Sequence, residues 1–461
     1  MALAEAKQWL DSSLATVAAR YDVPGMAVGV LVGDSVVESA AGVLSLNTGV
    51  EATPESVFQV GSITKIWTST LVMQLVDEGL LSLDEPVRSA LPSFAVVSES
   101  ASASVTPRQL LDHTSGFEGD IFTETNKGTD AVELFVDKVL PDVPQLFPAG
   151  SMFSYNNAGY SVLGRIVEVL RDKPYTQALR DHLIVPLGLE HIATLPEEAL
   201  LFRAAVGHFK PEPTAKLTAA PVWNLPYTTA PAGSMLAMSP RSLLTFAQLH
   251  LRGGVAASGA RVLSEASVLA MQEVQLQIPN TAPSQGQGLG WRITELPGGR
   301  VVHHDGNTIG QSAFLRLVPS ANAAVCVLTN TDVAALIFHE VAGRLLEEVA
   351  GVSLPALDAP PSAPVAVEPR RYVGRYEARV ASYEVGATDD GTLWFSQRPC
   401  GEFAALFTGE PEQYRLATAD GVRFVTVEPV EGQHQSIAFS GDDDAGRATF
   451  LHTGRAVARV S

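Results

Sequence analysis

The most informative stretch of this 461-residue chain reads GSITKIWTSTLVMQLV and covers residues 61–76. Its apolar residues recur at helical spacing and stop before Gly79, which predicts a helix that begins near Ser62. Ser62 and Lys65 are three residues apart, so a helix places them one turn apart on the same face. The apolar residues around Lys65 favour a buried amine over a lysine on the surface.

A lysine buried beside a serine can act as a base. Burial disfavours the ammonium, so the amine can lose its proton near neutral pH. It can then take the hydroxyl proton while Ser62 attacks a carbonyl carbon. The start of the helix adds free N–H groups beside the oxyanion that develops. On this motif alone, a serine that caps the helix and a solvated lysine form an equally good interpretation.

A second stretch, PAGSMFSYNNAG at residues 148–159, precedes an apolar segment that predicts a helix over residues 160–170. Tyr155 would project from this loop, where its phenol could relay a proton to a leaving group or to water. Asn157 would orient the substrate and Lys65 through its amide. Taken alone, the stretch is better explained as an asparagine-rich turn beside a core tyrosine.

The third stretch, His303-His304-Asp305-Gly306-Asn307, is expected at the end of a strand. Gly306 would allow a substrate backbone to approach that strand closely. The N–H of Asn307 could pair with the N–H of Ser62 as an oxyanion hole. A turn that carries a solvated histidine is the competing interpretation of this stretch.

The remaining pattern predicts one sheet completed from distant parts of the chain. A helix over residues 3–20 is followed by a hairpin over residues 26–39, with Gly33-Asp34 as its turn. Residues 62–270 read as helical segments, and residues 288–330 return to strands before a helix over residues 333–349. The central helices would form an inserted subdomain, and a crevice beside them is the expected place for a site.

The C-terminal part changes character after a proline-rich linker. Seven short apolar runs lie beyond residue 370, separated by turn signals such as Asp420-Gly421, and they predict a small antiparallel barrel or sandwich. The expected division is residues 1–352, a linker over residues 353–369, and a barrel over residues 370–461. No cluster of catalytic residue types is evident in this last part.

Composition limits the partners and the compartment. The net charge of −19 repels phosphate backbones and anionic lipid, so neither nucleic acid nor a membrane is an expected partner. No apolar run reaches the roughly 20 residues that a membrane helix needs, and the N-terminus lacks the pattern of a signal peptide. We expect a cytoplasmic protein, with a removed leader as the alternative. Cys326 and Cys400 are expected to be buried thiols, and no metal or cofactor is predicted.

Together the three motifs resemble the serine β-lactamase and penicillin-binding-protein superfamily, in its class C β-lactamase, DD-peptidase and family VIII esterase branch. Ser-x-x-Lys corresponds to Ser62 and Lys65, Tyr-x-Asn to Tyr155 and Asn157, and Lys-Thr-Gly is replaced by His304-Asp305-Gly306. The resemblance covers about residues 5–350. Four further stretches are similar to the same branch: VPGMAVG (residues 23–29), LLDHTSG (110–116), PAG (231–233) and GLGW (288–291).

The resemblance implies an α/β fold, with an antiparallel sheet flanked by helices and a mainly helical insertion. It implies acylation of Ser62, with acid and base duty shared by Lys65 and Tyr155, orientation by Asn157, and an oxyanion hole at Ser62 and Asn307. The C-terminal strands resemble the lipocalin-like domain that some members of the superfamily carry.

The third motif departs from the family in a way that bears on the substrate. In penicillin-recognising members its lysine meets a substrate carboxylate, whereas a histidine is mostly neutral at pH 7. We therefore expect a serine hydrolase for esters or for amide and peptide substrates, of the carboxylesterase or D-amino-acid-selective peptidase type, with poor turnover of β-lactams. One alternative is a thioesterase or acyltransferase that cyclises or aminolyses peptides, and another is a binder that retains the acyl group. The expected partner is a small molecule or peptide, and a homo-oligomer is left open.

Overall fold

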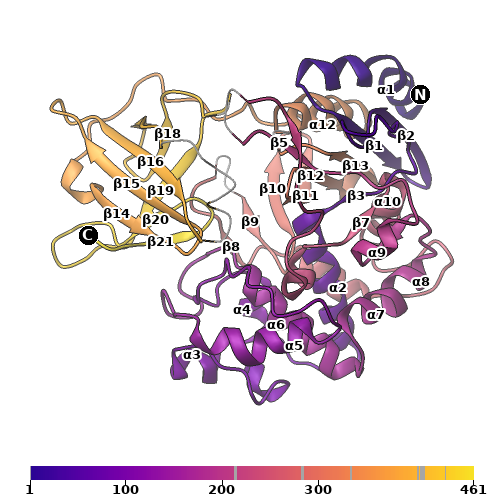
Figure 1. Ribbon diagram of the computed structural model, residues 1–461, viewed down its shortest axis with the longest axis horizontal. Coiled ribbons are helices and arrows are strands. Elements are labelled where there is room, and N and C mark those ends of the chain that lie inside the picture. The colour runs from indigo at the N-terminus through magenta and orange to yellow at the C-terminus, as the bar shows by residue number, and fades with distance from the viewer. Residues whose placement is uncertain are drawn as a thin grey trace.

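The computed structural model describes residues 2–211, 215–281, 285–332, 335–401, 404, 411–430 and 432–461. Two bodies of secondary structure are visible in Figure 1: a sheet with helices on both faces, and a closed barrel beside it. The helices α3 to α6 lie in the lower part of that view, below the sheet. Both the helix-flanked antiparallel sheet and the barrel were predicted from the sequence, and both are confirmed.

The main sheet has eight strands in the order β2-β1-β13-β12-β11-β10-β9-β8. All neighbouring pairs are antiparallel, and β1 pairs with β13 over residues 26–32 and 323–329. The sheet is therefore completed from the two ends of a long segment, as predicted. Its strands are Gly25–Val32 (β1), Ser35–Gly42 (β2), Leu276–Gln277 (β8), Gly286–Gln287 (β9), Arg292–Leu296 (β10), Gly299–Thr308 (β11), Gln311–Val318 (β12) and Ala323–Thr329 (β13).

Helices cover the two faces of this sheet. One face packs against α1 (Ala2–Arg20) and α12 (Ala335–Ala350). The other packs against α2 (Thr64–Asp77) and α10 (Pro240–Leu251), which are joined by the stacked rings of Trp67 and Phe246 at 3.9 Å between centroids. The central helix of the site is thus held inside the largest apolar core of the molecule.

The remaining helices and short strands belong mostly to the insertion between β2 and β8. The helices are α3 (Glu99–Ser104), α4 (Pro107–Leu111), α5 (Ala131–Leu134), α6 (Asn157–Arg171), α7 (Tyr175–Leu179), α8 (Val185–Leu187), α9 (Pro196–Ala199) and α11 (Glu265–Met271). The short helical turns are η1 (Gly61–Ile63), η2 (Val87–Ser89), η3 (Phe135–Val139), η4 (Leu140–Asp142), η5 (Arg180–Ile184), η6 (Tyr227–Ala232), η7 (Pro319–Ala321) and η8 (Pro369–Arg371). The short strands are β3 (Phe58–Gln59), β4 (Ile192–Ala193), β5 (His208–Phe209), β6 (Thr218–Ala219) and β7 (Ala237–Met238).

The barrel closes with eight strands in sequence order around its own apolar core. The sequence predicted seven of them, and the eighth, β21, was missed because its sequence Ala-Val-Ala-Arg has one large apolar side chain beside two small alanines. The strands are Gly374–Glu377 (β14), Ala381–Ala387 (β15), Leu393–Pro399 (β16), Tyr414–Thr418 (β17), Arg423–Thr426 (β18), Ser436–Ser440 (β19), Phe450–His452 (β20) and Ala456–Arg459 (β21).

Two local expectations, for residues 288–291 and for Cys400, differ from the structure. The stretch over residues 288–291 is a turn and not a strand, because Gly290 has a φ of +92° and a Cβ there would overlap the Ser69 hydroxyl. The residues from His303 to Asn307 form the last part of β11, which ends at Thr308, as expected. Cys400 is half-exposed, whereas Cys326 is buried as expected. The helix expected from residue 333 is α12, and its first two expected residues lie outside the described part of the chain.

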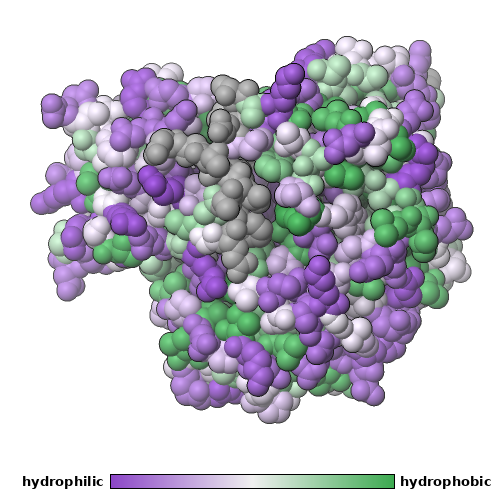
Figure 2. Space-filling view, viewed as in Figure 1, coloured by the Kyte–Doolittle hydropathy of each residue, from purple (hydrophilic) through white to green (hydrophobic). Residues whose placement is uncertain are grey.

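On the face of the molecule shown in Figure 2, hydrophilic residues separate the hydrophobic ones into scattered patches. None of the helices in the described ranges has both the length and the apolar character that crossing a lipid bilayer requires.

The close packing of α6 on η6 can be tested by a pair of glycine-to-alanine substitutions. A Cβ on Gly164 of α6 would overlap the Pro231 ring in η6, whereas a Cβ on Gly343 of α12 would lie 3.5 Å from Leu354 Cδ1, an ordinary contact. Alanine is the better helix former by about 1 kcal/mol, but overpacking costs typically 1–3 kcal/mol. Gly164→Ala should lower the free energy of unfolding, and Gly343→Ala should leave it equal or raise it, as measured by denaturant titration. Equal effects of the two variants would contradict this packing.

Candidate active site

Ser62 and Lys65 sit where η1 turns into α2. Gly61, with a φ of +50°, starts this turn, and Lys65 follows in the first turn of α2 with a fully buried side chain. Lys65 Nζ lies 3.1 Å from Ser62 Oγ, 2.6 Å from Asn157 Oδ1 and 2.7 Å from the Ala232 carbonyl oxygen. The predicted juxtaposition of a serine and a buried lysine is therefore present.

The three contacts of Lys65 are all to oxygen atoms, two of a carbonyl type and one of a hydroxyl. A neutral amine has two N–H donors and one lone pair, and the two shortest contacts are to carbonyl oxygens, which only accept. The third neighbour, the Ser62 hydroxyl, can donate its proton to the lone pair. Burial lowers the pKa of Lys65 well below its ordinary value, and the Arg455 and Arg292 guanidinium groups lower it further. This geometry can move a proton from Ser62 to Lys65.

Tyr155 lies in the loop before α6, with its ring 4.7 Å from Lys65 Nζ. The side chain is buried, and burial raises the pKa of Tyr155 to about 12, although Arg292 and the Ser62 hydroxyl act in the opposite direction. The phenol is therefore protonated at neutral pH. Two neighbouring groups thus have displaced pKa values, lowered for the Lys65 amine and raised for the Tyr155 phenol, as is expected of a base and an acid that lie side by side.

Asn157 is the first residue of α6, and Asn156 caps that helix by accepting the Gly159 N–H at 2.7 Å. The Asn157 amide is oriented from both sides: its oxygen accepts from Lys65, and its nitrogen donates to Asp120 Oδ1 at 2.6 Å. Asp120 in turn forms an ion pair with Arg455. A continuous chain of polar contacts thus runs from Arg455 to the Ser62 hydroxyl.

Arg455 comes from the barrel, in the turn that joins β20 to β21. This turn is fastened to the loop that carries Tyr155: the Tyr155 N–H donates to the Gly454 carbonyl at 3.0 Å, and the Ala456 N–H donates to Ser154 Oγ at 3.1 Å. The Arg455 guanidinium lies 5.0 Å from the centre of the Tyr155 ring. The barrel therefore contributes to the site, which the sequence did not suggest.

Arg292, the first residue of β10, is the second group that the sequence interpretation missed. Its guanidinium carbon lies 5.6 Å from the centre of the Tyr155 ring, and its Nε is buried without a hydrogen-bond partner. The only sequence signal for Arg292 is its position directly after the GLGW stretch. For Arg455 there was no comparable signal, because it belongs to a part without catalytic motifs.

The third motif lies along β11 beside η1. A Cβ on Gly306 would overlap the Val60 carbonyl and lie 2.9 Å from the Ser62 nitrogen, and a Cβ on Gly61 would lie 2.6 Å from the Asn307 nitrogen. The backbone of Asn307 is therefore next to that of Ser62, as an oxyanion hole would require. Beyond His303, β11 has lost its partner β10 and pairs only with β12, so its other edge is open.

His304 is buried beside this edge, contrary to a solvated histidine. Its Nδ1 lies 2.6 Å from the Asp305 carbonyl, and its Nε2 has no hydrogen-bond partner. Burial lowers its pKa well below the ordinary value, and Arg292 and Lys65 act in the same direction. His304 is therefore neutral, and the positive charge near the site belongs to Arg292 and Arg455 instead.

His113 and Thr114 lie behind the site and hold its loops. His113 adopts a φ of +63°, its Nδ1 accepts the Asn156 N–H at 3.0 Å, and its ring lies 4.4 Å from that of Tyr155. Thr114 donates to Asp112 Oδ1 at 2.6 Å. These contacts give both residues a structural role in holding the loops behind the site.

A cavity of about 320 Å³ opens in front of Ser62. Five of the seven predicted site residues line it, while Lys65 and Gly306 lie behind its wall. In the part of the chain that the structure describes, no three His, Cys, Asp or Glu side chains are grouped as a metal site would need. The cavity lining includes Ser62, Tyr155, Asn157, His304, Asn307, Arg292 and Arg455.

Several known proteins are similar to this chain in sequence and in fold. Penicillin-binding protein 4 of Amycolatopsis lactamdurans is 42% identical over 365 residues, which cover 77% of this chain and 94% of that protein. The crystal structure of SurE superposes with a TM-score of 0.77 at 28% identity over the whole of both chains. A second SurE structure, with D-Leu, gives 0.75 at 26% identity, covering 100% of this chain and 99% of that one.

More distant structures share the fold. A mutant of a class C β-lactamase has a TM-score of 0.62 at 20% identity, covering 75% of this chain and 98% of that one. The sequence profile of the β-lactamase family matches residues 10–350, the part that holds all three motifs. The chain therefore belongs to the β-lactamase family and is a serine hydrolase of the penicillin-binding-protein type.

Proposed function

We propose that Ser62 is the nucleophile of this hydrolase, with Lys65 as its base and Tyr155 as its acid. One observation carries the proposal: the buried Lys65 amine has its two donor positions directed at carbonyl oxygens and its third neighbour is the Ser62 hydroxyl at 3.1 Å. An amine in this state is ready to accept a proton without first losing one to solvent.

Acylation then proceeds with all protons accounted for. The Ser62 proton passes to Lys65 as Ser62 Oγ forms a bond with the substrate carbonyl carbon. The N–H groups of Ser62 and Asn307 stabilise the oxyanion. When the bond to the leaving group breaks, Tyr155 gives its proton to that group, and the Lys65 ammonium restores the proton to the phenolate. Deacylation repeats the sequence with water as the attacking group and Ser62 as the leaving group.

For the substrate we propose an ester, amide or peptide whose acyl group is a D-residue. The SurE structure with D-Leu supports this choice, since SurE matches this chain over its full length. Neutral His304 stands where penicillin-recognising relatives have a cation, which supports poor turnover of β-lactams.

Acyl transfer to an amine is the second candidate. D-Leu carries both a carboxyl group and an amine, so the same comparison also supports an amino group as the acceptor. An acyl-enzyme that reacts with an amine gives an aminolysed or cyclic product, which mass spectrometry separates from a hydrolysed one. The name of the relative from Amycolatopsis lactamdurans supports a third outcome, a stable penicilloyl adduct. A single stoichiometric burst without turnover would indicate it.

Ser62 and Tyr155 are tested with D-aminoacyl p-nitrophenyl esters and p-nitroanilides. Ser62→Ala should abolish both the reaction and the mass increase of the acyl-enzyme, whereas Ser69→Ala, on the same helix and paired with Tyr160 at 3.2 Å, should retain them. Tyr155→Phe should slow the anilide about 10²- to 10⁴-fold, the usual contribution of a general acid. The ester should be affected less, because nitrophenolate leaves without a proton. Full activity of Ser62→Ala would contradict the proposal.

The role of Lys65 as the base is tested by the pH dependence of kcat/KM in variants of Arg455. Arg455 lowers the pKa of Lys65 and Asp120 raises it. Arg455→Met should therefore raise this pKa for two reasons: it removes a positive charge, and it leaves the negative charge of Asp120 without its partner. Because the neutral amine is the active form, the acid limb of kcat/KM should move to higher pH, by on the order of one pH unit. Arg455→Lys, which keeps the positive charge, should shift it less. A shift to lower pH, or equal shifts in both variants, would exclude this role.

Turnover of a chromogenic cephalosporin tests His304. Loss of a charge-assisted hydrogen bond costs about 1.5–3 kcal/mol, so kcat/KM for the cephalosporin should be lower than for a D-aminoacyl ester by about 10- to 150-fold. His304→Lys should narrow this gap. Efficient cephalosporin hydrolysis by the unaltered protein would refute the expectation.

A further inference from the structure

A second cavity, of about 740 Å³, lies between the barrel and the open end of β11. It shares part of its wall with the cavity of Ser62: Phe122, Leu225, Asn307 and Arg455 line both. From Asn307, whose backbone adjoins Ser62, its wall continues through Thr308 to the β11–β12 turn at Gly310. The two cavities therefore adjoin each other, and the second extends from the wall of the first.

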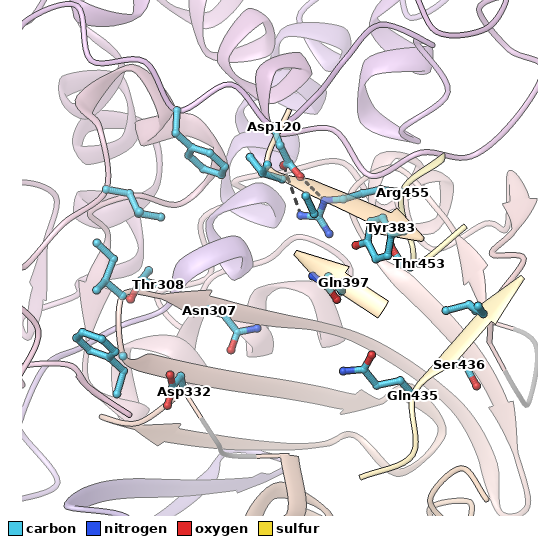
Figure 3. Close-up of a pocket in the computed structure, with 18 residues that line it drawn as sticks. Asp120, Asn307, Thr308, Asp332, Tyr383, Gln397, Gln435, Ser436, Thr453 and Arg455 are labelled. Atoms are coloured by element: carbon cyan, nitrogen blue, oxygen red, sulfur yellow. Dashed lines mark hydrogen bonds and ion pairs between the residues drawn. The ribbon is translucent and has the colours of Figure 1, made fainter. Parts of the chain in front are cut away.

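Half of the residues that line this second cavity belong to the barrel. Figure 3 shows Gln397 and Gln435 on barrel segments, opposite Asn307 and Thr308, with the Asp120–Arg455 ion pair at one end. The barrel wall is fixed relative to Ser62 through that ion pair and through His452, whose Nε2 lies 2.7 Å from the Phe153 carbonyl. The distance between the nucleophile and the barrel wall is thus set by direct contacts.

The chemistry of the wall favours an uncharged amide-rich chain. Its apolar side chains include Phe122, Leu225 and Ile437, and neutral amides are supplied by Gln397 and Gln435. These two glutamine side chains are exposed to the cavity and can both donate to and accept from peptide groups. The charged residues in the wall are Asp120, Arg455 and Asp332, and Asp120 is paired with Arg455. The wall therefore offers an acidic chain no excess of positive charge.

The volume fits a ligand larger than the reacting residue. Cavities of roughly 300–1,000 Å³ hold molecules of drug size and above, and the cavity in front of Ser62 already holds about 320 Å³ of space. The additional 740 Å³ is therefore room for the chain that extends from the acyl residue. An open strand edge at its entrance offers backbone groups to an extended peptide.

We propose that this cavity binds the chain of a peptidyl acyl donor, several residues long and without acidic side chains, and that the barrel selects donors by this chain. The proposal rests on the acylation of Ser62 proposed above. It assigns the barrel a part in substrate selection, in addition to the placement of Arg455.

A length series of peptidyl p-nitrophenyl esters tests it, with the same D-residue at the reacting end and one, two, four or six uncharged residues. In the unaltered protein kcat/KM should rise with length by at least about tenfold, which corresponds to roughly 1.4 kcal/mol of binding energy. Gln397→Trp and Gln435→Trp should each reduce the ratio of long-ester to short-ester kcat/KM. Glu384→Trp, an exposed barrel position outside the cavity wall, is the matched control and should keep the ratio. A six-residue ester with glutamates should lose the advantage of length.

Binding is measured separately by calorimetry on Ser62→Ala, with the six-residue peptide amide as the ligand. Adding Gln397→Trp to this protein should weaken binding, and adding Glu384→Trp should not. No length dependence, or equal loss of short and long esters in the tryptophan variants, would overturn the role of the cavity while leaving Ser62 acylation intact. Failure of every ester to acylate Ser62, with peptide binding retained, would instead remove the proposed function.

Discussion

The burial of the Lys65 amine is the constraint on which the rest of the site depends. A lysine removed from water must either lose its proton or find compensating partners. Here the partners are the carbonyl oxygens of Asn157 and Ala232, which come from α6 and η6. Gly233, with a φ of +122°, permits the approach, since a Cβ there would overlap the Gly61 carbonyl. The packing of α2 against α6 and η6 therefore also determines the surroundings of the Lys65 amine, and with them its proton affinity.

The barrel acts on Lys65 electrostatically, through the charge of Arg455. Asp120 alone would favour the Lys65 ammonium, and Arg455 offsets it from the far side of the ion pair. Because Asn157 lies between Asp120 and Lys65, the same ion pair also fixes which end of the Asn157 amide faces the amine. A part of the chain that looks like an attachment in the sequence thus acts on the proton affinity of the base. It also supplies half of the lining of the cavity that adjoins the one in front of Ser62.

Local chemistry explains what the sequence could predict. Ser62 and Lys65 are three residues apart at the start of α2, and Tyr155 and Asn157 are two residues apart at the start of α6, so their spacing determines that each pair lies close together. The alternation of the strands predicted the sheet and seven of the eight barrel strands for the same reason. His304 was harder: it is buried beside Tyr155, with 6.3 Å between the ring centres, and no local pattern specifies a contact between residues so far apart in the sequence.

Arg455 could not be predicted, because its partner Asp120 is 335 residues away and joins it only when the barrel docks. The neighbouring β21 has a single large apolar side chain, Val457, so the strand and the arginine were missed together. Arg292 was missed because the turn at Gly290, which sets where β10 begins, depends on the close approach of Ser69. Both arginines thus reach the site only through tertiary contacts, and both affect the pKa of Lys65 from outside the three motifs.

The most direct test is the titration of Lys65 itself, followed by NMR of protein labelled with ¹³C at the lysine Cε and assigned with Lys65→Met. The account predicts that Lys65 loses its proton far below the ordinary lysine value of 10.5, so that the amine is neutral where the enzyme works. A Lys65 signal that titrates at or above that value would show a permanent ammonium. It would contradict the assignment of this residue as the base.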